Sequence, residues 1–122
     1  MSNITRTLAI ATVVALGVTA QASAHAELKS ATPPADGTVA AAPTELDLKF
    51  SEDLNLKFSG VTVTGPDKKA VQTGDATLMD GNTTLMVPLT GTLAAGVYTV
   101  AWHALSADGH KTHGTYKFTV KP

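Results

Sequence analysis

The stretch VYTVAWHALSADGHKTHGTYKFTV, residues 97–120, has apolar side chains at every second position in both of its halves. These positions are Tyr98, Val100, Trp102 and Ala104 in the first half, and Tyr116, Phe118 and Val120 in the second. Successive side chains of a β-strand point to opposite faces of the sheet, so each half predicts a strand with one buried face. The fold is therefore expected to be built from strands.

Between these two strands, Asp108-Gly109 is a strong signal for a hairpin turn. A two-residue turn at these positions would place Trp102 opposite Thr115, and the two apolar faces would then lie on different sides of the sheet. Either the loop is longer than two residues, or the two strands belong to different sheets.

Three further segments, Glu45–Phe50, Gly60–Thr64 and Thr83–Leu89, alternate in the same way. Pro88 cannot donate a backbone hydrogen bond, which predicts an edge strand or a bulge for the last of them. Lys29–Pro43 is rich in proline and small residues and is interpreted as a connecting loop. Because no helical periodicity accompanies these short strands, they favour an antiparallel β-sandwich.

Residues 1–24 have the pattern of a secretory signal peptide. The apolar run Leu8–Val18 is too short to span a bilayer, and Ala22-Ser23-Ala24 supplies small residues for cleavage. Cleavage there would leave residues 25–122 as one exported domain without a membrane span. His25 would then be the first residue of the mature chain.

The composition excludes several kinds of function. Removal of residues 1–24 takes away Arg6 and leaves eight lysines against ten carboxylates, a net charge of −2 with neutral histidines. Such a chain has no basic tract for nucleic acid or anionic lipid. It contains no cysteine, which excludes thiol redox chemistry and support from disulfides.

The polar loop between the last two strands carries candidate metal ligands. Asp108 and His110 are two positions apart, so in an extended segment they can offer a carboxylate oxygen and an imidazole nitrogen to one ion. An N-terminal His25 would add its free amine and its Nδ1 as a chelate. Three nitrogens and one oxygen suit Cu(II), which stands at the top of the divalent affinity order, with zinc as the competitor.

Three stretches, HAELKSATPPADGTV, LDLKFSEDLNLKFSG and GVYTVAWHALSADGHKTHGTYKFTV, together resemble the copper-resistance protein C (CopC/PcoC) family. The resemblance covers essentially all of residues 25–122. It implies an all-β, antiparallel Greek-key sandwich of cupredoxin or immunoglobulin type, with about seven strands. It also implies a periplasmic protein that binds one Cu(II) per chain through His25, Asp108 and His110.

Two further residues are candidates for the outer part of the site. Glu52 matches an acidic residue near the copper in relatives, and His113 follows His110 at a spacing that a metal ligand could have. For His113 an exposed polar role is the favoured interpretation. His103 lies on the strand face opposite Trp102 and is interpreted as a solvated histidine or one in the outer part of the site.

The segment GPDKKAVQTGDATLMDGN, residues 65–82, departs from part of the family. Some relatives carry a methionine-rich loop with a histidine there, which holds Cu(I) through thioethers. Met79 is the only methionine of this segment, and the segment has no histidine. The chain is therefore identified as the type of member that binds Cu(II) alone.

The expected function is to sequester or deliver copper without turnover, as a monomer. The expected partners are the copper ion and either a membrane copper importer or another periplasmic copper protein. Two alternatives stay open. One is a small oxidative copper enzyme of the histidine-clamp type, and the other is a metal-free interaction sandwich, in which changing His25 would have no effect.

Overall fold

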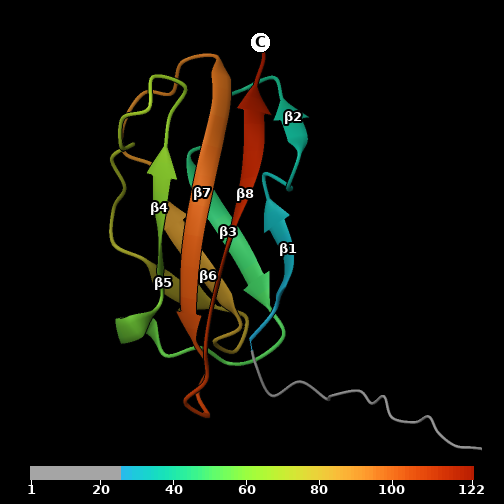
Figure 1. The fold of residues 1–122 in the computed structure, drawn as a ribbon, viewed down its shortest axis with the longest axis vertical. Helices are drawn as coiled ribbons and strands as arrows, with labels where there is room; N and C mark the ends of the chain where they lie inside the picture. The colour runs from blue at the N-terminus through green and yellow to red at the C-terminus, as the bar shows by residue number, and fades with distance from the viewer. Residues whose placement is uncertain (1–25) are drawn as a thin grey trace, which may run out of the picture.

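Eight strands form two four-stranded sheets in the computed structural model, which describes residues 26–122 (Figure 1). The first sheet has the order β1 (Leu28–Thr32), β3 (Glu45–Phe50), β6 (Thr84–Pro88) and β5 (Thr77–Met79). The second has the order β2 (Gly37–Val39), β8 (Lys111–Val120), β7 (Gly96–Leu105) and β4 (Gly60–Thr64). A short 3-10 helix, η2 (Leu56–Phe58), precedes β4. The predicted signal segment and His25 lie outside the described residues.

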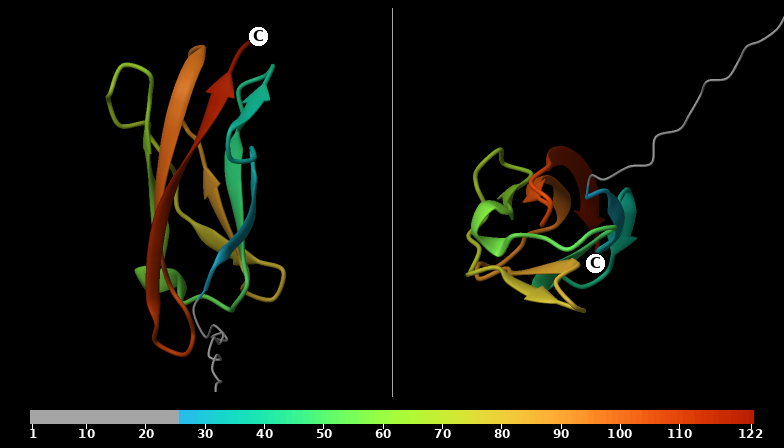
Figure 2. Two further views of the ribbon diagram at one scale, coloured as in Figure 1. Left: turned by 45° about the vertical axis from the view of Figure 1, so that its right-hand side comes forward. Right: turned by 90° about the horizontal axis from the view of Figure 1, so that it is seen from below.

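The predicted β-sandwich is confirmed. The two sheets face each other as layers, and the β7–β8 loop extends beyond them at one end (Figure 2). All five segments predicted as strands form strands, and neighbouring strands run antiparallel with one exception. The exception is β2, which pairs with β8 in parallel. No helix within residues 26–122 is long and apolar enough to cross a membrane.

Aromatic rings join the inward faces of the two sheets. Phe50 of β3 meets Trp102 of β7 edge to face, with ring centroids 5.1 Å apart and an interplanar angle of 70°. Within the second sheet Tyr98 and Phe118 stack at 5.4 Å. Such pairs add about 0.5–1.5 kcal/mol beyond the burial of their area. The Phe50–Trp102 contact therefore joins β7 to the first sheet, whereas the Tyr98–Phe118 stack joins the two long strands β7 and β8 to each other.

The β7–β8 hairpin resolves the register that the sequence left open. The two strands are direct neighbours, so the alternative that placed them in different sheets is wrong. The prediction of a loop longer than two residues is confirmed, because Trp102 lies opposite Gly114 and not opposite Thr115. With this register the apolar faces of both strands point into the same core.

One expectation about a single segment is wrong, and a second is wrong in part. Lys29–Pro43 was interpreted as a loop, but it contains most of β1 and all of β2. Both are edge strands that receive their hydrogen bonds from β3 and β8, so neither depends on a strong alternating pattern of its own.

Pro88 was expected to mark an edge strand or a bulge. The edge strand is wrong, because β6 lies between β3 and β5, but the pairing register does shift by one residue around Pro88, from Thr77 opposite Met86 to Thr73 opposite Leu89. The proline is tolerated because it is the last residue of β6. The N–H of Leu89 donates toward β3, to Thr44, so the nitrogen of Pro88 faces the β5 side. β5 does not extend as far as Pro88, since its first residue, Thr77, pairs with Met86.

Candidate metal site at the β7–β8 hairpin

The loop that carries Asp108 and His110 is a tight turn closed by two backbone hydrogen bonds. The N–H of Gly109 donates to the carbonyl of Ser106, and the N–H of Ser106 donates to the carbonyl of His110, each at 2.9 Å. Gly109 has a φ of 97°, in the region that glycine adopts without a steric penalty. The turn therefore returns the chain so that Ser106 and His110 face each other, with Asp108 between them.

Asp108 and His110 lie in direct contact. The Oδ1 of Asp108 is 3.1 Å from the Nδ1 of His110, and the backbone N–H of His110 donates to the same oxygen at 3.3 Å. The hydroxyl of Ser106 donates to this oxygen as well. Both side chains remain about half exposed, with relative accessibilities of 43% for Asp108 and 48% for His110. The predicted pair is thus oriented at the surface and accessible to an ion.

These hydrogen bonds lower the pKa of Asp108 from 3.8 to about 2, mainly through the Ser106 hydroxyl and then through His110. A carboxyl with a lowered folded-state pKa stabilises the fold above its unfolded pKa, and this contribution is lost as the pH falls from about 4 toward about 2. Asp108 is therefore an anion at any pH at which the neighbouring imidazole can ligate a metal.

We expect Ser106→Ala to move the Asp108 pKa upward from about 2 toward 3.8, because the substitution removes the largest cause of the shift. Carbon-13 NMR of the Asp108 carboxyl during an acid titration measures the midpoint directly. Ser30→Ala, at an exposed position of β1, is the control and should leave the midpoint unchanged. An unchanged midpoint in Ser106→Ala would show that the hydroxyl does not hold the carboxylate.

The start of the described chain is anchored beside this hairpin. The hydroxyl of Thr112 donates to the carbonyl of Ala26 at 2.8 Å, and Ala26 is fully buried. The N–H of Glu27 donates to the hydroxyl of Ser51, and the N–H of Ser51 donates to the carbonyl of Glu27, each at 2.9 Å. Thr112 is two residues beyond His110, about 7 Å along an extended strand. The chain therefore enters the sandwich at the end that carries Asp108 and His110.

Glu52 lies on the segment that connects these two anchors. Its neighbour Ser51 bonds to Glu27, and its other neighbour, Asp53, accepts a hydrogen bond from the N–H of Ala107 at 2.9 Å. The backbone at Glu52 is thereby held between the start of the chain and the hairpin turn. Its side chain is partly exposed.

The structure does not bring His113 to the same place. Residues His110 and Thr112 face the inner side of the hairpin, whereas His113 is exposed on the outer face of the second sheet, directly opposite His103. The odd spacing from His110 explains this, because side chains alternate between faces along a strand. The prediction that His103 is solvated agrees with its exposure.

Ser106, Thr112 and Ser51 make the hydrogen bonds around the hairpin and the start of the described chain, and the sequence did not indicate them as site residues. The alternation of the sequence could have indicated Ser106, because this polar residue continues the inward series of β7 after Ala104. In the structure its side chain is buried. A buried hydroxyl requires a hydrogen-bond partner, and Asp108 supplies it. The roles of Thr112 and Ser51 depend on contacts across the fold and had no local signal.

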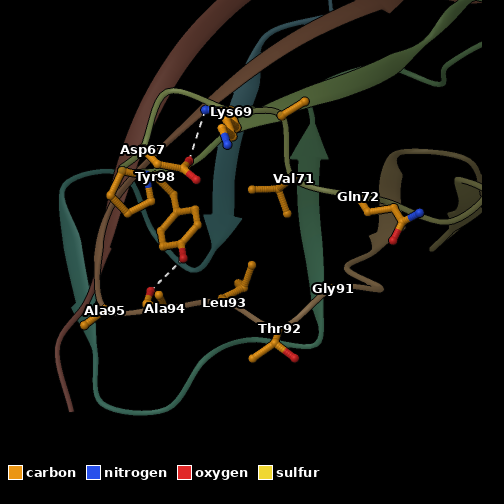
Figure 3. Close-up of a pocket in the computed structure, with 13 residues that line it drawn as sticks. Asp67, Lys69, Val71, Gln72, Gly91, Thr92, Leu93, Ala94, Ala95 and Tyr98 are labelled. Atoms are coloured by element: carbon orange, nitrogen blue, oxygen red, sulfur yellow. Dashed lines mark hydrogen bonds between the residues drawn. The ribbon is translucent and has the colours of Figure 1, made fainter.

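A separate hollow of about 430 Å³ lies at the other end of the sandwich, among the loops around residues 65–72 and 91–95 (Figure 3). The Tyr98 hydroxyl donates to the carbonyl of Ala94 at 2.6 Å, and Asp67 accepts from the N–H of Lys69 at 3.0 Å. None of its lining residues is a histidine. This hollow is therefore distinct from the predicted metal site.

Residues 28–121 match the CopC domain. The chain belongs to the CopC domain family. It is 44% identical over 105 residues to Protein YobA of Escherichia coli strain K12, with 85% of each chain covered. It is 40% identical over 114 residues to Copper resistance protein C of Escherichia coli, covering 87% of this chain and 89% of that protein. The crystal structure of CopC from Methylosinus trichosporium OB3b aligns with a TM-score of 0.74 at 34% identity, covering 80% of this chain and 95% of that chain.

Because the chain belongs to the CopC family, the relevant question is whether the residues of this site fit a copper ion. Within residues 26–122, no group of three or more histidine, cysteine or acidic side chains is arranged to hold a metal. Asp108 and His110 supply one oxygen and one imidazole, which fit copper by type but are too few for a tight site. Ala26, the first described residue, lies at the same end of the sandwich as this pair, because its carbonyl accepts a hydrogen bond from Thr112.

Proposed function

We propose that the mature chain begins at His25 and binds one Cu(II) ion through the His25 amine and imidazole, Asp108 and His110. The hydrogen bond between Thr112 and Ala26 carries this proposal, because it holds the residue next to His25 beside the hairpin. Consecutive Cα atoms are about 3.8 Å apart, so His25 is covalently within reach of that end of the sandwich. Glu52 lies in the outer part of the site.

The contact between Asp108 and His110 supports two neighbouring donors on one ion. Two donor atoms that are each about 2.0–2.2 Å from a metal and lie at right angles around it are about 3 Å apart. The 3.1 Å between Oδ1 and Nδ1 is close to that separation. Little movement of the hairpin is needed for both side chains to bind, and the turn that holds them is already closed.

The ligand set favours Cu(II) over other divalent ions. Amine and imidazole nitrogens with one carboxylate suit a tetragonal ion, and copper exceeds zinc in the divalent affinity order. Because the amine and both imidazoles must lose their protons to ligate, binding weakens on acidification. Asp108, with its lowered pKa, remains ionised through that range.

We further propose that the protein holds or delivers copper in the periplasm and does not turn over a substrate. Its family supports this role, since relatives at 36% and 40% identity are named as copper resistance proteins. A carboxylate on the ion also occupies coordination space that an oxygen-activating copper enzyme needs. A membrane copper importer or another periplasmic copper protein is the corresponding partner.

The test is a Cu(II) titration of residues 25–122 followed by electron paramagnetic resonance, with Asp108→Ala and His110→Ala beside the parent protein. One tight equivalent with a tetragonal, nitrogen-rich spectrum is expected, and each substitution should weaken it by about tenfold or more. Asp53→Ala and His113→Ala are matched controls that change an acid and a histidine outside the proposed ligand set. The absence of stoichiometric binding, or equal losses in the controls, would contradict the proposal.

A further inference from the structure

His103 and His113 are direct cross-strand neighbours on the outer face of the second sheet. Both side chains are exposed, and neither belongs to the proposed Cu(II) site. Residue pairs of an antiparallel ladder alternate between hydrogen-bonded and non-hydrogen-bonded types. Since Ser106 and His110 form a bonded pair at 2.9 Å, counting back places His103 and His113 at a non-hydrogen-bonded pair. That is the type of pair in which opposite side chains lie closer together.

The two imidazoles border one hollow of about 420 Å³. Its other lining residues are Lys57, Phe58, Ala104, Lys111 and Thr112. No carboxylate is among these residues, so neither histidine meets an acidic partner in the hollow. The His103 ring packs against Gly60 on β4, because an added Cβ at Gly60 would lie only 3.2 Å from its Cε1. The imidazole of His103 therefore lies toward β4, and both rings remain exposed to solvent.

We propose that His103 and His113 chelate one borderline divalent transition-metal ion, Cu(II) most strongly. Cβ atoms of such a pair are about 4.5–5.5 Å apart, which allows both imidazoles to place a nitrogen about 2.0 Å from a common ion. Water completes the coordination. Closing the chelate requires rotation of the exposed His103 ring between staggered rotamers, a motion of picoseconds to nanoseconds.

This second site is independent of the N-terminus and lies on the other face of the hairpin from Asp108 and His110. It is also the weaker of the two, because it has two protein donors and because Lys57 and Lys111 border it with like charge. An exposed, weak copper site next to a tighter one is suited to rapid exchange. Its chemistry is that of a surface at which copper can be taken up or passed on.

The experiment is a Zn(II) and a Cu(II) titration of residues 25–122 beyond one equivalent, observed through the NMR signals of the labelled imidazoles. After the first equivalent, Zn(II) should shift, and Cu(II) should broaden, the signals of His103 and His113 together. His103→Ala and His113→Ala should each weaken the second equivalent by about a hundredfold, because either change leaves a single imidazole. In His110→Ala, metal binding at His103 and His113 should persist although the first site is weakened. This variant therefore distinguishes failure of the second site from failure of the proposed function.

Thr115→Ala is the matched control, since Thr115 is the next exposed position on the same face of β8. It should leave the second equivalent unchanged. Response of only one of the two histidines, or a second equivalent that survives either histidine substitution, would overturn the chelate. Equal weakening by Thr115→Ala would overturn it too, because the effect would then not come from the imidazoles.

Discussion

One additional residue before His25 is expected to reduce the Cu(II) affinity of the protein by a factor of roughly 10³, about 4 kcal/mol. The extension converts the His25 amine into an amide, whose nitrogen donates to copper only after it has lost its proton, and it leaves the His25 imidazole without the chelate ring that the amine completes. The folded domain should be unaffected, because the chain from Ala26 onward is held by Thr112 and Ser51. Competition titration against a chelator of known affinity measures the change.

Two companion proteins make the result specific. Proteolytic removal of the extra residue should restore the affinity in the same sample, and His25→Ala, which keeps the amine but loses the imidazole, should fall between the two. Equal Cu(II) affinity with and without the extension would remove the N-terminal chelate from the proposal. Asp108 and His110 would then remain as a two-donor site only.

The strands could be predicted because burial on one face imposes a local pattern. Leu46, Leu48 and Phe50 alternate since one side of β3 faces the core, and all three are buried. The edge strands β1 and β2 lacked such a pattern. They are defined by hydrogen bonds from β3 and β8, which a sequence read one segment at a time does not contain.

In the candidate site, too, the features that depend on residues close in sequence could be predicted, and those that depend on distant residues could not. Asp108 and His110 could be predicted as a pair because they are close in sequence and share a turn. The face occupied by His113 was also predictable from its odd spacing to His110, once the segment was known to be a strand. The anchoring of Ala26 by Thr112 was not, because it joins residues 86 positions apart. That contact is what connects the proposed N-terminal ligand to the hairpin.

Gly114→Ala is expected to lower the free energy of unfolding by about 1–3 kcal/mol. A Cβ at Gly114 would lie 2.7 Å from Cζ2 and 2.9 Å from Cε2 of Trp102, closer than side-chain carbons pack in proteins. The indole is rigid and is held edge to face against Phe50, so it cannot move aside without disturbing the contact between the sheets. Urea denaturation followed by far-UV circular dichroism measures the loss, and this signal is also available when Trp102 is replaced.

Gly91→Ala supplies the matched control, because the nearest atom to a Cβ at Gly91 is 3.9 Å away. It should change the stability by no more than about 0.5 kcal/mol. In a Trp102→Ala background the cost of Gly114→Ala should shrink to the level of that control, since the clashing ring is gone. If Gly114→Ala were as mild as Gly91→Ala in the parent protein, the close approach of Trp102 to β8 would be wrong. A selective loss in the parent would instead show that this glycine sets how closely Trp102 packs against β8, four residues from His110.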